Sequence, residues 1–140
     1  MNLETIQSMW EKDSQIDIIK VHEEAARIPS LHAKYWDVYN SVKLLKEKAQ
    51  TQEATVRLER YNYYTGKSDP EVYQAEPFPY KVRDKESVRR YMDADERMQK
   101  ILLKIKYYDA MLVYLEDIVK QINNRSYQLK NIIDWQQLSG

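Results

Sequence analysis

Residues 60–67, "RYNYYTGK", place three tyrosines between an arginine and a lysine, and Arg57 precedes them by one helical turn. Tyrosine rings stack on nucleic-acid bases and Lys or Arg neutralises phosphates, so this mixture suits a single strand of nucleic acid. A helical register points Tyr63 inward and leaves its neighbours around the sides of the helix. The candidate nucleic-acid contacts are Arg57, Arg60, Tyr61, Tyr64 and Lys67. The alternative is a rim of tyrosines that only packs the end of a helix.

The remaining residues offer no set of side chains for catalysis, a cofactor or a metal. Cysteine is absent, which removes thiol nucleophiles and thiolate metal ligands. His22 and His32 lack the spacing of a metal-binding helix. "GKS" at 66–68 lacks the earlier glycine of a phosphate-binding loop, and carboxylate runs such as Glu23 and Glu24 are typical of solvated helix faces. We therefore expect no enzyme activity, no cofactor and no metal.

Net charge and hydropathy restrict the partners further. The chain has 22 Lys and Arg against 22 Asp and Glu, so nucleic-acid binding would need a local basic patch. Residues 29–67 supply a modest one, with seven Lys or Arg against four Asp or Glu. The longest apolar run, 110–115, is too short to cross a bilayer, and the N-terminus lacks the pattern of a signal peptide. We expect a soluble, cytoplasmic protein.

The first long helix is predicted over residues 30–66, after Pro29 ends the preceding helix. Steps of four and three residues define a heptad seam, and Gln52 and Glu59 are its two weak positions. The apolar or aromatic positions of the seam are Leu31, Tyr35, Val38, Val42, Leu45, Ala49, Val56 and Tyr63. Such a helix is roughly 50 Å long, too long for a compact domain of this size, so we expect it to project.

The other elements follow from breakers and periodicity, within a single helical domain over 1–140. Short helices fill residues 1–29, a proline-containing loop spans 67–86, and a second seamed helix covers 87–122. "NN" at 123 and 124 is predicted to break it before a C-terminal helix over 124–138. The fold class is therefore all-α: a long helical hairpin with shorter terminal helices. A small β-hairpin at 70–83 is the one alternative to loop.

The C-terminal helix carries more apolar surface than one face would hide in a monomer. The candidate subunit contacts are Leu129, Ile132, Ile133 and Trp135. The alternative is that this helix docks on its own hairpin. If several copies assemble, weak nucleic-acid contacts on each copy act together, and linkage of sites raises avidity by roughly 10²- to 10⁴-fold.

Four segments, in order, resemble the bacteriophage recombination mediator family UvsY: "DSQID" at 13–17, "IPSLHAKY" at 28–35, "RYNYYTGK" at 60–67 and "INNRSYQLKNIIDW" at 122–135. The likeness spans nearly the whole chain. The family's Lys-x-Arg before the tyrosines is here Leu58-Glu59-Arg60, so only Arg60 carries over directly, with Arg57 as its neighbouring substitute.

This resemblance implies a non-enzymatic protein that binds single-stranded DNA in the host-cell cytoplasm. It also implies a phage single-strand-binding protein and the phage RecA-like recombinase UvsX as partners, the recombinase being loaded onto covered DNA. The expected assembly is a ring-like homo-oligomer of about six or seven copies. The competing hypothesis is a helical scaffold or adaptor that acts through coiled-coil contacts without touching DNA.

Overall fold

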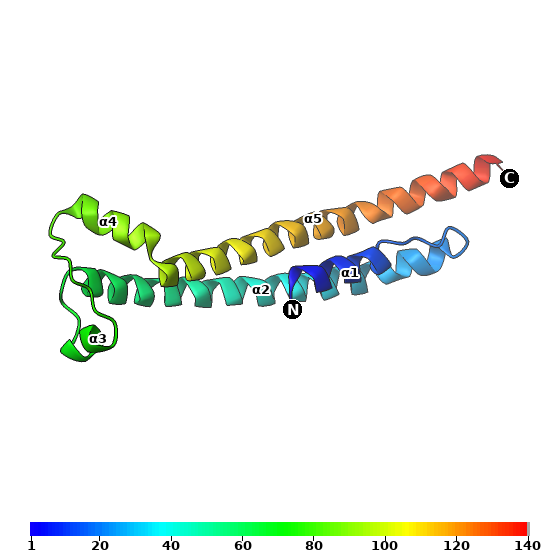
Figure 1. Ribbon diagram of the computed structural model, residues 1–140. Helices are drawn as coiled ribbons and strands as arrows, with labels where there is room; N and C mark the ends of the chain where they lie inside the picture. The colour runs from blue at the N-terminus through cyan, green and yellow to red at the C-terminus, as the bar shows by residue number, and fades with distance from the viewer. Residues whose placement is uncertain (140) are drawn as a thin grey trace. The chain divides into compact units, whose positions relative to one another are not determined.

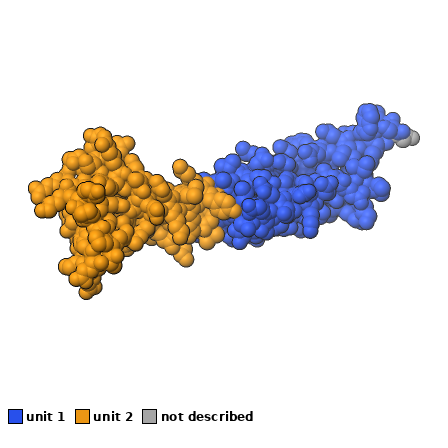
Figure 2. All heavy atoms as spheres, in the orientation of Figure 1, with its two compact units in different colours: residues 1–44, 109–140 blue, residues 45–108 orange. Residues whose placement is uncertain are grey.

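The computed structural model describes residues 1–139, which fall into two compact units. One unit contains residues 1–44 and 109–140, and the other contains residues 45–108 (Figure 2). The helices are α1 (Leu3–Asp13), α2 (Val21–Tyr64), α3 (Pro70–Ala75), α4 (Lys85–Ala94) and α5 (Glu96–Ser139), shown in Figure 1. No strand occurs between residues 1 and 139, so the all-α prediction is confirmed. No helix in this part of the chain is long and apolar enough to span a membrane.

In the first unit, the C-terminal half of α1 packs against α2 and α5. Asn2 caps α1 by accepting a hydrogen bond from the Thr5 amide at 2.8 Å, and Trp10 meets Tyr35 edge to face with ring centroids 5.5 Å apart. Arg125 donates to the carbonyl oxygens of Asp13 at 3.1 Å and Ser14 at 3.0 Å. Because the last carbonyls of a helix lack partners within it, these bonds fix the end of α1 against α5.

Asp13 links α1 to α2 in the same unit. Its carboxylate accepts hydrogen bonds from Lys34 at 2.6 Å and from the Tyr35 hydroxyl at 2.8 Å. Burial acts to raise the pKa of Asp13, but these two hydrogen bonds and the charge of Lys34 outweigh it, so the pKa lies below its usual value. Burial and the Asp13 carboxylate raise the pKa of Tyr35.

The structure corrects the predicted helix boundary at Pro29, because α2 begins at Val21 and continues through it. A proline inside a helix costs about 3 kcal/mol. Burial on both sides opposes that cost, since Val21 and Leu31 are each 5% exposed. The heptad seam is buried at Leu31, Tyr35, Val42, Ala49 and Tyr63, whereas Leu45 is 40% exposed. The predicted segments 1–29 and 30–66 are therefore α1 and a single long α2.

The predicted end of this helix at Gly66 is confirmed. Gly66 has φ 76°, a left-handed conformation that favours glycine. The Lys67 amide donates to the Asn62 carbonyl at 2.8 Å, and the Gly66 amide donates to the Tyr63 carbonyl at 3.4 Å. This pair of bonds is the Schellman motif, which satisfies the last carbonyls of α2.

The second long helix also has different bounds from those predicted. α5 runs from Glu96 to Ser139 through "NN" at 123 and 124, and the interruption lies at Asp95, between α4 and α5. Asparagine costs only a few tenths of a kcal/mol in a helix. Ile122 and Leu129, on either side, are 0% and 2% exposed, so their burial outweighs it. The start of the predicted segment 87–122 is therefore the separate helix α4, and the rest of it forms one continuous helix, α5, with the predicted segment 124–138.

The segment predicted as loop over 67–86 contains the short helix α3, and the alternative of a β-hairpin at 70–83 was wrong. Pro70 occupies the first helical turn, where its missing N–H has no partner to lose. Pro77 and Pro79 follow, and a proline cannot donate to a strand ladder. In this unit Val88, Met92 and Met98 form a buried cluster, against which Val56, Tyr64 and Val82 pack.

Candidate nucleic-acid interface

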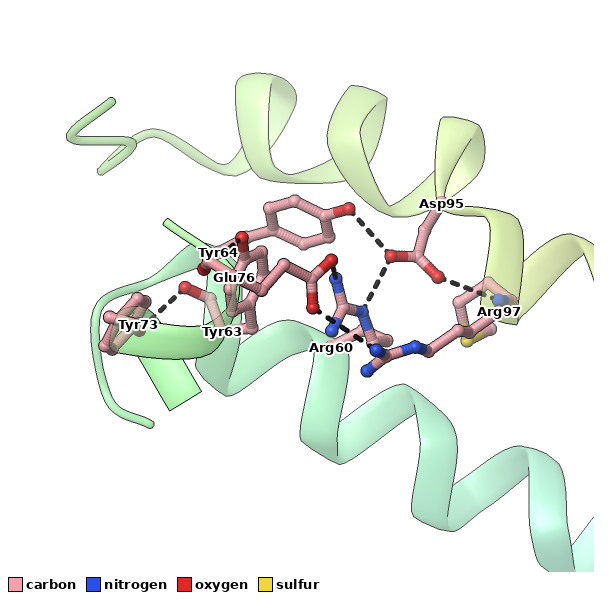
Figure 3. A network of polar contacts seen from close by, with 8 residues as sticks. Arg60, Tyr63, Tyr64, Tyr73, Glu76, Asp95 and Arg97 are labelled. Atoms are coloured by element: carbon pink, nitrogen blue, oxygen red, sulfur yellow. Dashed lines mark hydrogen bonds and ion pairs between the residues drawn. The ribbon is translucent and has the colours of Figure 1, made fainter. Parts of the chain in front are cut away.

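Arg60, one of the predicted DNA contacts, is buried inside the second unit, where it is 4% exposed. Figure 3 shows it beside Asp95 and Glu76. Its Nε donates to Oδ2 of Asp95 at 2.7 Å, and its Nη2 lies 3.8 Å from Oε1 of Glu76. The guanidinium also lies over the Tyr63 ring, 4.2 Å from the centroid, and 5.3 Å from that of Tyr64. The charge and the flat face of Arg60 are thus both occupied within its own chain.

Tyr64 and Tyr63 pack into the same cluster. The Tyr64 hydroxyl donates to Oδ2 of Asp95 at 2.7 Å, and its ring stacks on Tyr91 with centroids 5.5 Å apart. Tyr63 is buried, as predicted, and its hydroxyl donates to the Glu76 carbonyl at 2.9 Å. Tyr73 in turn donates to the Tyr63 carbonyl at 2.8 Å (Figure 3). For Tyr63 and Tyr64, the packing alternative describes the structure.

Asp95 holds this network together. Its Oδ1 accepts the Met98 amide at 2.8 Å, which caps α5, while Oδ2 accepts both Arg60 and Tyr64. Burial acts to raise the pKa of Asp95, but hydrogen bonds from Tyr64, Met98 and Arg60 outweigh it and leave the pKa below its usual value. The pKa of Tyr64 is raised by burial and by its bond to Asp95. Asp95 is therefore ionised at neutral pH and compensates Arg60.

The other three predicted DNA contacts lie at the surface. Tyr61 is 43% exposed, and the ammonium of Lys67 lies 5.5 Å from its ring centroid. Arg57 is exposed and forms an ion pair with Glu53 one turn away. Arg57 and Tyr61 are four residues apart on α2 and so share a face of the helix. The structure thus separates the five candidates into a packed pair, buried Arg60 and half-buried Tyr64, and an exposed group.

The predicted subunit contacts divide in the same way. Leu129 is 2% exposed in the single chain, in agreement with the docking alternative for that position. Ile132 and Ile133 are half-buried, whereas Trp135 is 71% exposed and Leu138 is 82% exposed. Gln136 donates to the Ile18 carbonyl at 2.9 Å. The end of α5 therefore contacts its own unit by one face and leaves a large apolar surface on the other.

Two features of the second unit were not predicted from the sequence. The first is the bond between Asp95 and Arg60, because nothing local connects Asp95 to a residue 35 positions earlier. The second feature is a groove lined by α2 and α5, with Lys100 and Lys104 on its α5 side. A local signal for it existed, since residues 97–108 contain four Lys or Arg and no carboxylate. Among residues 1–139, no group of three or more acidic, His or Cys side chains is arranged to hold a metal.

Comparisons with known proteins agree along nearly the whole chain. Residues 9–140 match the family model described as recombination, repair and ssDNA binding protein UvsY. The recombination protein uvsY of Enterobacteria phage T4 is 25% identical over 134 residues, which are 96% of this chain and 94% of that protein. Two crystal structures of the bacteriophage T4 recombination mediator protein UvsY superpose with TM-scores of 0.84 and 0.85 at 23% and 24% identity. They cover 100% and 99% of this chain, and 100% and 98% of their own. The chain therefore belongs to the UvsY family of recombination, repair and single-stranded DNA-binding proteins.

Proposed function

We propose that this protein is a recombination mediator that loads a RecA-like phage recombinase, of the UvsX type, onto DNA covered by single-strand-binding protein. The observation that carries this proposal is the family match over residues 9–140, together with a fold shared along the full length with a T4 recombination mediator. A mediator holds one DNA strand in a path that weakens the grip of the covering protein and presents the strand to the recombinase. That transfer needs binding surfaces and no bond chemistry.

The exposed part of the predicted DNA surface consists of Arg57, Tyr61 and Lys67. The aromatic ring of Tyr61 can stack on a base, and the two cations can bind the neighbouring phosphates. Arg60 and Tyr64 serve this surface indirectly, because their bonds to Asp95 fix the last turns of α2 from which Tyr61 projects. So small a contact is weak in one copy, and we infer that several copies share one strand.

The assembly that supplies those copies is proposed to be a ring-like homo-oligomer. Trp135 and Leu138 support it, since large apolar side chains this exposed on a single chain mark a contact surface. Ile132 and Ile133, half-buried beside them, would complete the contact. Leu129 contributes from within the chain by holding α5 in place.

The test measures binding to a fluorescent oligothymidylate by anisotropy across a salt series, with mass followed by light scattering. The variant Arg57→Gln, Lys67→Gln loses two cations from the proposed surface, and Lys12→Gln, Lys20→Gln loses two exposed cations near the N-terminus as a matched control. Each phosphate contact contributes about 0.7 to the magnitude of the slope of log affinity against log salt concentration. The slope of the first variant should therefore be smaller by about 1.4, and the slope of the control should equal that of the wild type.

A wild-type protein that gives flat anisotropy at low salt would reject DNA binding and leave the helical scaffold hypothesis. A protein that binds DNA but remains a monomer at micromolar concentration would reject the ring. A slope that falls equally in both variants would show that only total charge matters, and the surface around Tyr61 would then have no special role.

A further inference from the structure

A groove of about 490 Å³ lies in the second unit between α2 and α5. Its floor is apolar, formed by Val56, which is half-buried, and by Ile101, which is 8% exposed. Thr51 and Thr55 line the α2 wall, and Lys100 and Lys104 line the α5 wall. The groove thus offers an apolar surface beside one row of cations.

Charge is distributed unevenly around the groove. Four of the residues from 97 to 108 are Lys or Arg and none is Asp or Glu. Elsewhere on this unit some exposed cations are paired, as in Arg89 with Asp93 and Arg90 with Glu86, each four residues apart. Within residues 1–139, no carboxylate lies within ion-pair distance of Lys100 or Lys104. No ion pair within residues 1–139 therefore competes with an external anion for these two lysines.

The two ends of the groove differ. Arg97 lies one turn before Lys100 and is engaged with Glu76, its Nη2 lying 3.2 Å from Oε2. Glu59 lines the groove with Arg97 and contributes a negative charge on the α2 wall. An anionic ligand is therefore favoured toward Lys104 and Thr51 and disfavoured toward Glu59, which gives the groove a direction.

Lys100 and Lys104 also border a second hollow on the other side of their row. That hollow is lined by Leu103 and Tyr107, which are 68% and 39% exposed. Apolar and aromatic surface thus flanks the lysine row on both sides. A ligand with a row of anionic groups and flat apolar groups projecting from it matches this arrangement, and a polynucleotide single strand has both.

We propose that Lys100 and Lys104 bind neighbouring phosphates of single-stranded DNA, with sugars and bases lying against Val56 and Ile101 or against Leu103 and Tyr107. The two lysines are four residues apart, about 6 Å along the helix axis. That distance spans one to two nucleotide steps at a rise of about 3.4 Å. An acidic peptide would use the lysines but gain less from the flat apolar surfaces. This inference rests on the proposed function and extends it with a DNA-binding surface separate from Arg57, Tyr61 and Lys67.

The experiment compares Lys100→Gln, Lys104→Gln with Lys120→Gln, Lys130→Gln, a control that removes two exposed lysines from the first-unit part of α5. Anisotropy with oligothymidylate is measured across a salt series. Loss of two phosphate contacts should lower the salt slope by about 1.4 in the groove variant and leave the control at the wild-type slope. Helix content and mass should be unchanged in both, since all four side chains are exposed.

A second measurement uses the wild-type protein alone. Acetylation of each lysine by an amine-reactive ester is mapped by mass spectrometry with and without oligothymidylate, and Lys100 and Lys104 should be protected while Lys120 stays reactive. A groove variant with the wild-type slope, or protection by polyglutamate but not by oligothymidylate, would overturn this inference and leave the mediator proposal standing. Failure of the wild-type protein to bind oligothymidylate would overturn both.

Discussion

Replacement of Asp95 tests the buried network at the start of α5. Asp95 is 4% exposed and its carboxylate accepts three hydrogen bonds, from Arg60, Tyr64 and the Met98 amide. Asp95→Ala leaves the Arg60 guanidinium, itself 4% exposed, with only Glu76 at 3.8 Å. Removal of one partner of a buried ion pair costs about 3–5 kcal/mol. We expect a loss of that size in the free energy of unfolding, measured by urea denaturation with circular dichroism at fixed protein concentration.

Two further variants separate the parts of this loss. Asp95→Asn keeps a side chain that caps helices as well as aspartate does, so it should lose the ion pair but not the cap of about 1 kcal/mol. Combination of Asp95→Ala with Arg60→Leu removes both charges and should cost less than the sum of the single variants by about 0.5–3 kcal/mol. If Asp95→Ala lies within 1 kcal/mol of wild type, or if the two single losses add, the ion pair does not stabilise this unit as we argue.

Three other predictions use the same denaturation assay. The folded-state pKa of Asp13 lies below its unfolded value of about 3.8, so its stabilisation is present above about pH 4 and is lost as pH falls through the folded pKa; the difference between wild type and Asp13→Asn should therefore shrink as pH falls below about 4. Gly66→Ala should cost about 1–2 kcal/mol from backbone strain alone, because an added Cβ at φ +76° meets no atom within 4 Å. Leu129→Ala should cost about 2–5 kcal/mol, whereas Trp135→Ala should leave unfolding unchanged at a concentration where the protein is monomeric and reduce the assembled mass seen by light scattering. An equal effect of both substitutions on unfolding would contradict the division of the α5 surface described above.

The sequence predicted those features that depend on neighbouring residues: the helix content, the helix end at Gly66 and the inward position of Tyr63. The scarcity of glycine and proline and the apolar periodicity indicated helices, and the structure is helical. Gly66 was identified as a helix end because only glycine adopts a left-handed conformation without strain, and Tyr63 was placed inward by its position on the heptad seam. These features depend on a few consecutive residues and their spacing.

The errors arose where burial outweighs local preference. Pro29 and "NN" at 123 and 124 disfavour helix by themselves, but buried side chains on both sides keep the chain helical. Arg60 was expected at the surface for an equally non-local reason. Its charge is paired with Asp95 and Glu76, which lie 35 and 16 residues away in sequence, and no pattern within α2 indicates these partners. A single sequence places the side chain on a helix but does not reveal its distant partner.

The length of α5 restricts how this family can vary. Each residue turns a helix by about 100° and advances it by about 1.5 Å. A single deletion between Leu115 and Leu129, both buried, would swing every later side chain from its own side of the helix to another, and carry Trp135 with it. We therefore expect insertions and deletions within this helix to be tolerated only in multiples close to whole heptads. We expect this helix to accept many changes of residue type more readily than a single change of its phase.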